Sequence, residues 1–242
     1  MTHFADDLYL GNAKSKPTVS NPANLGWGFG PCGRTYSYDI LPLTLNAAAY
    51  AASQSPLVAG NLTLAAGTGV TATTDPGGNV AYAPDYPRAV SITSGGVDTA
   101  RTFTVYGYDY LGRAQTEAIT GSSSTVAYGK KAFASIWKIS VDAATASTVT
   151  AGTTDIFGLP VAITDKGYVL HVGCNSVLAN DTGTFTVADA TTATSTTGDV
   201  RGTYLPSVAS SGSVRTVITV ALKALQVGPS ATFAGLYGVT PA

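Results

Sequence analysis

Residues 103–141 read FTVYGYDYLGRAQTEAITGSSSTVAYGKKAFASIWKISV, and this stretch decides the fold class. Phe103 and Val105 alternate with threonines, so one face of an extended strand is apolar and the other is hydroxylated. Residues 108–112, YDYLG, place Asp and Gly where a chain reverses direction. The last strand is expected to place Phe133, Trp137, Ile139 and Val141 on one face and Lys138 and Ser140 on the other. The stretch therefore predicts antiparallel strands joined by tight connections.

The composition agrees with a mainly β protein. At 242 residues the chain can bury one sizeable core or two small ones. Of its fourteen acidic residues, Glu117 is the only glutamate, and twenty-seven residues are glycine. Glutamate is favourable in helices, whereas aspartate and glycine favour caps and turns. The expected architecture is an antiparallel β-sandwich or barrel-like domain with an extended N-terminal arm and one short helix.

The low charge limits the classes of partner. Charged residues make up 11% of the chain, against about 25% in an ordinary soluble domain. A surface rich in Thr, Ser and Ala suits permanent packing against other subunits. A net charge of −1 argues against direct nucleic-acid binding, which needs a basic surface. We interpret Lys130-Lys131, an adjacent basic pair, as the solvated tip of a loop.

Neither the cysteines nor the N-terminus indicate export. Cys32 and Cys174 lie far apart without a metal-binding spacing, and we interpret them as small core residues. The first ten residues, MTHFADDLYL, contain two acids and lack the apolar segment of a signal peptide. No stretch approaches the roughly 20 apolar residues of a membrane span. The sequence therefore predicts synthesis in the cytoplasm and no membrane contact.

Residues 1–86 are expected to form an extended arm with long turns and a short helix at about 46–55. Asn46 can cap this helix, a run of alanines favours it, and Pro56 ends it. Large aromatics spaced along an extended chain are suitable anchors on a neighbouring subunit, although the arm could instead wrap its own domain. The candidate anchors are Phe4, Tyr9, Trp27, Phe29, Tyr36 and Tyr38.

Residues 87–242 are expected to form the antiparallel β domain, with a possible break into two subdomains near residue 165. Further strands are predicted at 145–150, 154–163, 167–173, 184–187, 201–205 and 214–222. In the strand at 167–173, Tyr168, Leu170 and Val172 are expected to share a face.

The sequence offers no catalytic, cofactor-binding or metal-binding residues, and we expect that the protein is not an enzyme. His3 lies in the arm, and His171 is expected on a strand face without a partner motif. The aspartates follow neither a glycosidase nor a calcium-loop pattern. We interpret Asp109, Asp155, Asp165 and Asp181 as turn and loop residues that accept hydrogen bonds from nearby backbone.

Residues 103–163 and 199–223, together with the terminal AGLYGVTPA at 234–242, resemble virion structural proteins of tailed bacteriophages. The resemblance is to head-decoration or cement proteins and related minor structural proteins, and it covers about half of the chain. It implies a non-enzymatic protein of the capsid surface that is made in the host bacterial cytoplasm. The implied partners are the major capsid protein and further copies of this chain, with a trimer favoured by the resemblance alone.

Two other classes of function remain open at this point. The chain could be a tail, neck or head-fibre component, which the copy number per particle would distinguish from a capsid cement. It could also be a carbohydrate-binding β module, because some of its thirteen tyrosines could stack on sugar rings. A hydrolase is the least supported alternative, since no pair of acidic residues suits it.

Overall fold

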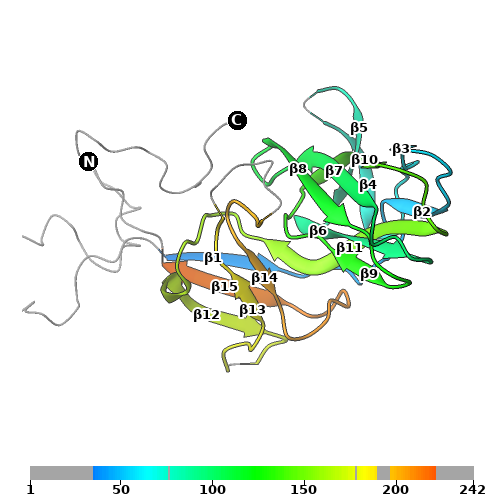
Figure 1. Cartoon of the computed structure of the whole chain (residues 1–242). Helices are drawn as coiled ribbons and strands as arrows, with labels where there is room; N and C mark the ends of the chain where they lie inside the picture. Colours follow the sequence, from blue (N-terminus) through cyan, green and yellow to red (C-terminus); the bar gives the residue numbers. More distant parts are fainter. Residues whose placement is uncertain (1–34, 76, 178, 190–196, 222–242) are drawn as a thin grey trace, which may run out of the picture.

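The computed structural model describes residues 35–75, 77–177, 179–189 and 197–221, and their regular structure is almost entirely β (Figure 1). The strands are β1 (Thr35–Ile40), β2 (Ala51–Gln54), β3 (Gly60–Asn61), β4 (Val70–Thr74), β5 (Val80–Pro84), β6 (Arg88–Ser94), β7 (Thr102–Tyr108), β8 (Ala114–Thr120), β9 (Val126–Tyr128), β10 (Ser135–Val141), β11 (Val149–Gly158), β12 (Val169–Cys174), β13 (Thr184–Thr186), β14 (Thr203–Leu205) and β15 (Thr216–Ala221). One 3₁₀ turn, η3 (Lys166–Tyr168), precedes β12. The predicted mainly β, antiparallel fold is confirmed.

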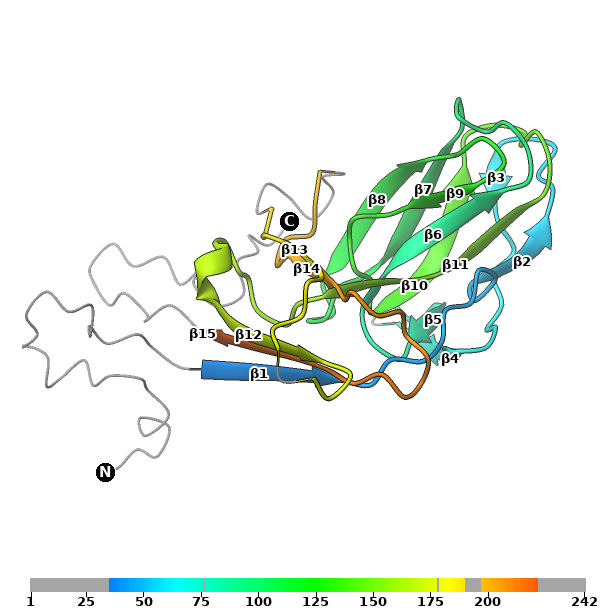
Figure 2. The ribbon, with the colours of Figure 1, turned by 90° about the horizontal axis from the view of Figure 1, so that it is seen from below.

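The strands form three antiparallel sheets. One has the order β4-β5-β10-β7-β8, with β3 also paired to β10. A second has the order β13-β14-β11-β6-β9, with β2 also paired to β11. The third, which we call the small sheet, has the order β1-β15-β12. Figure 2 shows the two larger sheets as the layers of a sandwich, with the small sheet beside them.

A first hydrophobic core fills the sandwich. Alternating residues of β7 and β10 face it, because successive side chains of a strand point to opposite sides. Residues Phe103 and Val105 are fully buried there, as the sequence pattern predicts. The other core members come from both sheets and include Tyr50, Val90, Ile92, Ile119, Phe133, Ile136, Ile139, Val141 and Val149.

A second core lies under the small sheet and is separate from the first. Its members are Tyr38, Ile40, Phe157, Leu159, Val161, Ile163, Val172, Tyr204, Ile218 and Val220. Strand β11 contributes to both cores, with Val149 at one end and Phe157 at the other. Its pairing with β6 shifts register between Thr153 and Phe157. The change from one core to the other therefore falls within β11, rather than near residue 165.

At two β-bulges, the faces of the strands differ from those that the sequence predicts. The pairing of β10 with β7 shifts between Ile136 and Lys138, so both Ile136 and Ile139 are buried while Trp137 is only half-buried. A bulge inserts one extra residue and so reverses the alternation beyond it. A similar shift between Val169 and His171 leaves Leu170 48% exposed. The sequence predicts that Trp137 shares a face with Ile139 and that Leu170 shares a face with Val172, but Ile139 and Val172 are buried whereas Trp137 is half-buried and Leu170 is exposed.

The predicted helix at 46–55 is wrong. Residues 47–50 form a turn, and β2 follows it directly. The Asn46 side chain accepts a hydrogen bond from the backbone N–H of Ala48 at 2.9 Å, which is an Asx turn rather than a helix cap. Tyr50 is fully buried and donates its backbone N–H to Ala151 at 2.9 Å. Tertiary packing on β11 thus overrides the helix propensity of the alanines.

The predicted arm at 1–86 is also wrong for the part that the structure describes. Strand β1 belongs to the small sheet, and β2–β5 belong to the two larger sheets. The first large sheet joins β4 and β5 to β10, β7 and β8, so it crosses the boundary that was expected at residue 86. Residues 1–34 lie outside the described residues.

Gly152 provides a test of the packing between β11 and the turn that replaces the predicted helix. A Cβ atom at this position would lie 2.5 Å from the Cα of Ala47 and closer still to the carbonyl oxygen of Asn46. We expect Gly152→Ala to lower the free energy of unfolding by about 1–3 kcal/mol or more, because both neighbours are backbone. Urea denaturation measures the change. The matched control is Gly60→Ala, where a Cβ has open space, and its effect is expected to stay within about 0.5 kcal/mol.

Candidate functional site

A network of buried ionisable side chains joins the sandwich to the second core. Its members are Asp109, Glu117, Lys131, Asp199 and Arg201, none of which is more than 3% exposed. They come from the β7–β8 hairpin, from the loop before β10 and from the segment before β14. Burying so many charges requires that each finds a partner.

Arg201 and Asp109 form an ion pair at the centre of this network. Arg201 Nη1 lies 2.8 Å from Asp109 Oδ2, and Arg201 Nε donates to the carbonyl of Leu159 at 3.1 Å. The other oxygen of Asp109 accepts the backbone N–H groups of Leu111 at 2.8 Å and Arg113 at 2.9 Å. Asp109 therefore shapes its own turn, as predicted, and also holds a residue 92 positions away.

Glu117 and Asp199 hold the loop that leads into β10. Glu117 accepts the backbone N–H groups of Lys130 at 2.5 Å and Lys131 at 3.1 Å. Asp199 accepts those of Ala132 and Arg201, both at 2.9 Å. Each carboxylate oxygen thus accepts a backbone hydrogen bond, and the four bonds fix two segments that are distant in sequence. We interpret the network as a structural cross-link rather than as an active site.

The prediction that Lys130 and Lys131 form a solvated loop tip is wrong for Lys131. Lys130 is exposed as expected, but Lys131 is fully buried and its Nζ donates to the carbonyl of Gly198 at 2.8 Å. Burial lowers the pKa of Lys131 and raises the pKa values of Glu117 and Asp199, because desolvation disfavours each charged form.

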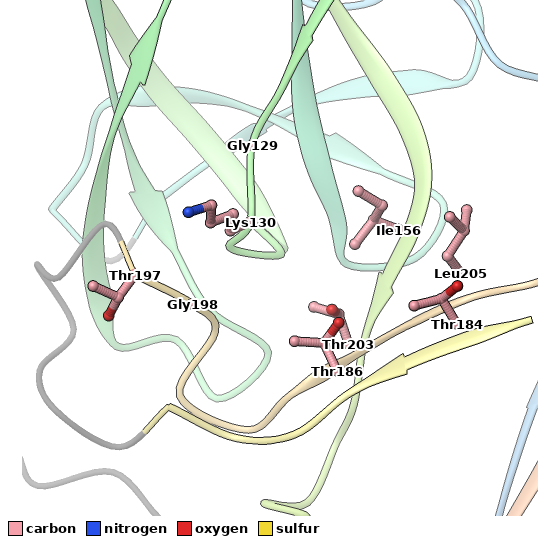
Figure 3. A pocket seen from close by; sticks show the side chains of 9 residues that line it. All are labelled: Gly129, Lys130, Ile156, Thr184, Thr186, Thr197, Gly198, Thr203 and Leu205. Atoms are coloured by element: carbon pink, nitrogen blue, oxygen red, sulfur yellow. The ribbon is translucent and has the colours of Figure 1, made fainter.

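A cavity of about 190 Å³ lies beside this network. It is lined by Gly129, Lys130, Ile156, Thr184, Thr186, Thr197, Gly198, Thr203 and Leu205. Figure 3 shows Thr184, Thr186 and Thr203 together along β13 and β14, with the Lys130 side chain on the Thr197 side. The hydroxyl of Thr197 donates to Asp189. Such a cavity can hold a small, mainly apolar group, and its described lining residues include no aromatic ring on which a sugar could stack.

An aromatic pair lies on the outer face of β7 and β10. The ring centroids of Tyr106 and Trp137 are 5.6 Å apart, and the planes are tilted by 48°. The ammonium of Lys138 lies 3.8 Å from the Tyr106 centroid and 5.0 Å from that of Trp137. One face of the Tyr106 ring is therefore already covered by a cation, which makes the pair a poor platform for sugar stacking.

Within the described residues, the small sheet has one edge covered by further chain and one edge, along β1, with which no described strand pairs, and we call the latter the open edge. At β12, Val172 donates its N–H to the Asn180 side chain at 2.7 Å and accepts the N–H of Asp181 at 2.8 Å. Within the described residues, β1 pairs only with β15 and its other edge has no strand partner. An edge strand carries backbone N–H and C=O groups that can pair with another chain. The open edge of β1 is the candidate interaction surface.

Both ends of the described chain lie next to this surface. Thr35, the first described residue, is paired with Ala221, the last one. Figures 1 and 2 show that β1 begins and β15 ends at the same end of the small sheet. The 34 residues before Thr35 and the 21 after Ala221 are therefore attached side by side.

The structure places two of the six candidate anchors. Tyr36 and Tyr38 lie in β1, where Tyr38 is buried in the second core and Tyr36 packs against it. Both tyrosines are thus used within this chain's own core. Phe4, Tyr9, Trp27 and Phe29 lie outside the described residues, as do Cys32 and His3. Cys174 is a free, buried cysteine, as predicted.

No known family model matches the chain, and no curated protein or solved structure matches it. Within the described ranges, no helix is long and apolar enough to cross a membrane. In the same part of the chain, no group of three or more His, Cys, Asp or Glu residues could hold a metal ion.

We expect the buried Arg201–Asp109 ion pair to contribute much more to the free energy of unfolding than an exposed ion pair does. Arg201→Met leaves Asp109 buried without its cation, and we expect a loss of about 3–5 kcal/mol in the free energy of unfolding. The matched control is Arg215→Met, which breaks an ion pair with Asp39 whose side chains are 63% and 41% exposed; it is expected to cost less than about 1 kcal/mol. Equal losses in urea denaturation would contradict the assignment of Arg201 as a cross-link.

The raised pKa of Glu117 predicts a dependence of stability on pH. A carboxyl whose pKa is higher in the folded state contributes stability that is complete below its unfolded pKa of about 4.3 and is lost as the pH rises through the folded pKa. Thermal denaturation is therefore expected to show a wild-type advantage over Glu117→Gln that shrinks from pH 4.5 towards pH 7.

Asp39→Asn is the control for that measurement. The hydrogen bond with Arg215 lowers the pKa of Asp39. The contribution of the Asp39 carboxylate to the free energy of unfolding is therefore lost only as the pH falls below about 3.9. The difference between wild type and Asp39→Asn is expected to stay constant above pH 5. A constant difference for Glu117→Gln as well would contradict the raised pKa.

Proposed function

We propose that this chain is a structural protein of a tailed-bacteriophage particle, which binds the capsid exterior and bridges neighbouring major capsid subunits. The observation that carries the proposal is that no described strand pairs with the second edge of β1, and that both ends of the described chain lie beside it. The resemblance of residues 103–163, 199–223 and 234–242 to virion structural proteins supports the same class.

A sheet edge without a described strand partner suits a protein that bridges neighbours. Strand addition at an edge uses backbone hydrogen bonds, so it needs no specific catalytic or charged side chains. The residues before Thr35 and after Ala221 lie outside the described residues, and both segments are joined to the small sheet at the end where Thr35 pairs with Ala221.

The surface supports a permanent assembly. The outer side of β7 and β8 carries Thr102, Thr104, Thr116 and Thr120, whereas the acidic Glu117 of the same sheet points inward and is buried. Exposed leucines and valines lie elsewhere, among them Leu57 at 83% and Val58 at 72% exposed. Hydroxylated and apolar surface of this kind is suited to burial in an assembly.

Two alternatives are separated by simple measurements. A tail, neck or head-fibre component would be present in few copies at one vertex or in the tail, whereas a cement protein occupies many equivalent lattice sites. A carbohydrate-binding module would gain thermal stability from an oligosaccharide, since a ligand that binds only the folded state raises the melting temperature. The covered Tyr106 ring is an observation against the sugar alternative.

The proposal predicts that a chain from which residues 2–30 have been deleted no longer binds to the particles. Deletion removes most of the N-terminal tail and leaves β1 intact, so the folded domain is expected to persist while its attachment fails. Cryo-EM reconstruction of wild-type and deletion particles measures the number and position of copies. Wild-type density at repeated capsid sites, absent after the deletion, is the expected result.

Gly60→Ala serves as the control for particle assembly, because a Cβ at this exposed position has open space. Its incorporation is expected to match the wild type. Undiminished incorporation of the deletion variant would contradict attachment through the tail. Wild-type density confined to one vertex or the tail would instead overturn the cement role and retain the structural class.

A further inference from the structure

A lysine and two carboxylic acids are buried together beside the cavity. Lys131 is 0% exposed, and Glu117 and Asp199 are each 2% exposed. Among the described residues, Lys131 is the only lysine that is buried. Lysine is almost never fully buried unless it is paired. The burial of an amine with two carboxyl groups places the reactants of an amide bond together, shielded from bulk solvent.

Lys131 and Asp199 each bond to the backbone beside the other. Lys131 Nζ donates to the carbonyl oxygen of Gly198 at 2.8 Å, and this carbonyl belongs to the peptide bond that leads into Asp199. In the other direction, Asp199 Oδ2 accepts the N–H of Ala132, the residue after Lys131, at 2.9 Å. Each side chain therefore crosses to the backbone of the other residue, which brings the amine and the carboxyl into the same part of the interior.

Glu117 is attached to the same loop and shares its environment. Its two carboxylate oxygens accept the backbone N–H groups of Lys130 at 2.5 Å and Lys131 at 3.1 Å. Burial lowers the pKa of Lys131, although the charges of Asp199 and Glu117 act in the opposite direction. Burial also raises the pKa of both carboxyl groups. The interior thus favours the neutral amine and the protonated acids, which are the forms that condense.

We propose that Lys131 and Asp199 form an amide bond with each other inside the folded chain, and that Glu117 transfers the protons. The lone pair of Lys131 Nζ attacks Cγ of Asp199, and one C–O bond of that carboxyl group breaks. Protonated Glu117 gives its proton to the departing hydroxyl, and its carboxylate takes a proton from the amine. The products are the amide, one water molecule and Glu117 in its starting form, and nothing is oxidised or reduced.

Burial favours the product of this reaction. A charged amine or carboxylate in the interior is costly, whereas an amide is neutral and keeps a carbonyl oxygen that can accept hydrogen bonds. The cavity of about 190 Å³ is lined by Gly198 and Lys130, as Figure 3 shows. It is large enough to receive the released water molecule.

The bond would connect the loop before β10 to the segment before β14, and so would join the sandwich to the second core covalently. A cross-link between distant positions restricts the unfolded chain, as a disulfide does. The reaction needs only this chain, so the inference does not rest on the proposed function.

The intact mass of the purified full chain tests the proposal. After allowance for removal of the N-terminal methionine, the wild type is expected to be lighter than its sequence by one water molecule. Trypsin does not cut after an acylated lysine, so its digest is expected to contain a branched peptide that joins residues 131–138 to residues 167–201. A chain of full mass would overturn the proposal. A digest that releases residues 132–138 and 167–201 separately would also overturn it, because the water would then have been lost elsewhere.

Substitution of the two reacting residues identifies the bond. In Asp199→Asn the leaving group is ammonia, so this variant is expected to be lighter by one ammonia instead of one water. Lys131→Arg has no amine that can form this amide, and it is expected to keep its full mass. The matched control is Lys130→Arg, which changes the exposed neighbour and is expected to lose water as the wild type does. Loss of water from Asp199→Asn or from Lys131→Arg would contradict the assigned pair.

Glu117→Gln tests the proton transfer. Glutamine keeps a carbonyl oxygen that can accept one of the backbone N–H groups of the loop, but it cannot exchange protons as a carboxylic acid does. We expect this variant to keep its full mass while circular dichroism verifies that it is folded. A folded Glu117→Gln chain that contains the branched peptide would contradict the role of Glu117. The wild-type mass and digest decide whether the amide forms, even where a variant fails to fold.

Discussion

The buried contact of Arg201 with Asp109 is the constraint on which the arrangement of the two cores depends. It takes two charges out of water, so it is tolerable only when every remaining hydrogen-bonding group is also satisfied. Asp109 meets this condition through the turn of the β7–β8 hairpin, and Arg201 meets it through Leu159. Asp199, two residues before Arg201, fixes the loop before β10 as well. The hairpin of the sandwich is thereby joined to the segment that leads into the second core.

Local sequence patterns predicted the strands well, but not the places where distant packing decides the geometry. Alternation in 103–141 reports which side of a strand is buried, and β7, β8 and β10 form there. The bulge at Trp137 depends on how β10 fits against β7, which no alternation reveals. At Asn46 the alanines favour a helix in isolation, yet close contact with Gly152 selects a turn. Small residues were needed for packing rather than for helix propensity.

The sequence could predict only part of the candidate interaction surface and of the buried charged network. Tyr36 and Tyr38 were predicted to anchor an extended arm on a neighbouring subunit, but they lie in β1 and contribute to the second core. That position depends on β15, about 180 residues later. Lys131 and Arg201 gave no local signal, because their partners lie 67 and 92 positions away. Because Lys and Arg are almost never fully buried unless they are paired, only the position of these distant partners could reveal that the two residues are buried.

The pairing of Thr35 with Ala221 also determines the order in which the chain can fold during synthesis. Strand β1 is the first of the described strands to leave the ribosome, and its partner β15 is the last. The sandwich strands β2–β11 can therefore assemble before β1 has its partner strand. Closing a loop of this length carries an entropic cost that only the completed second core repays. The small sheet can therefore close only after β15 has been synthesised.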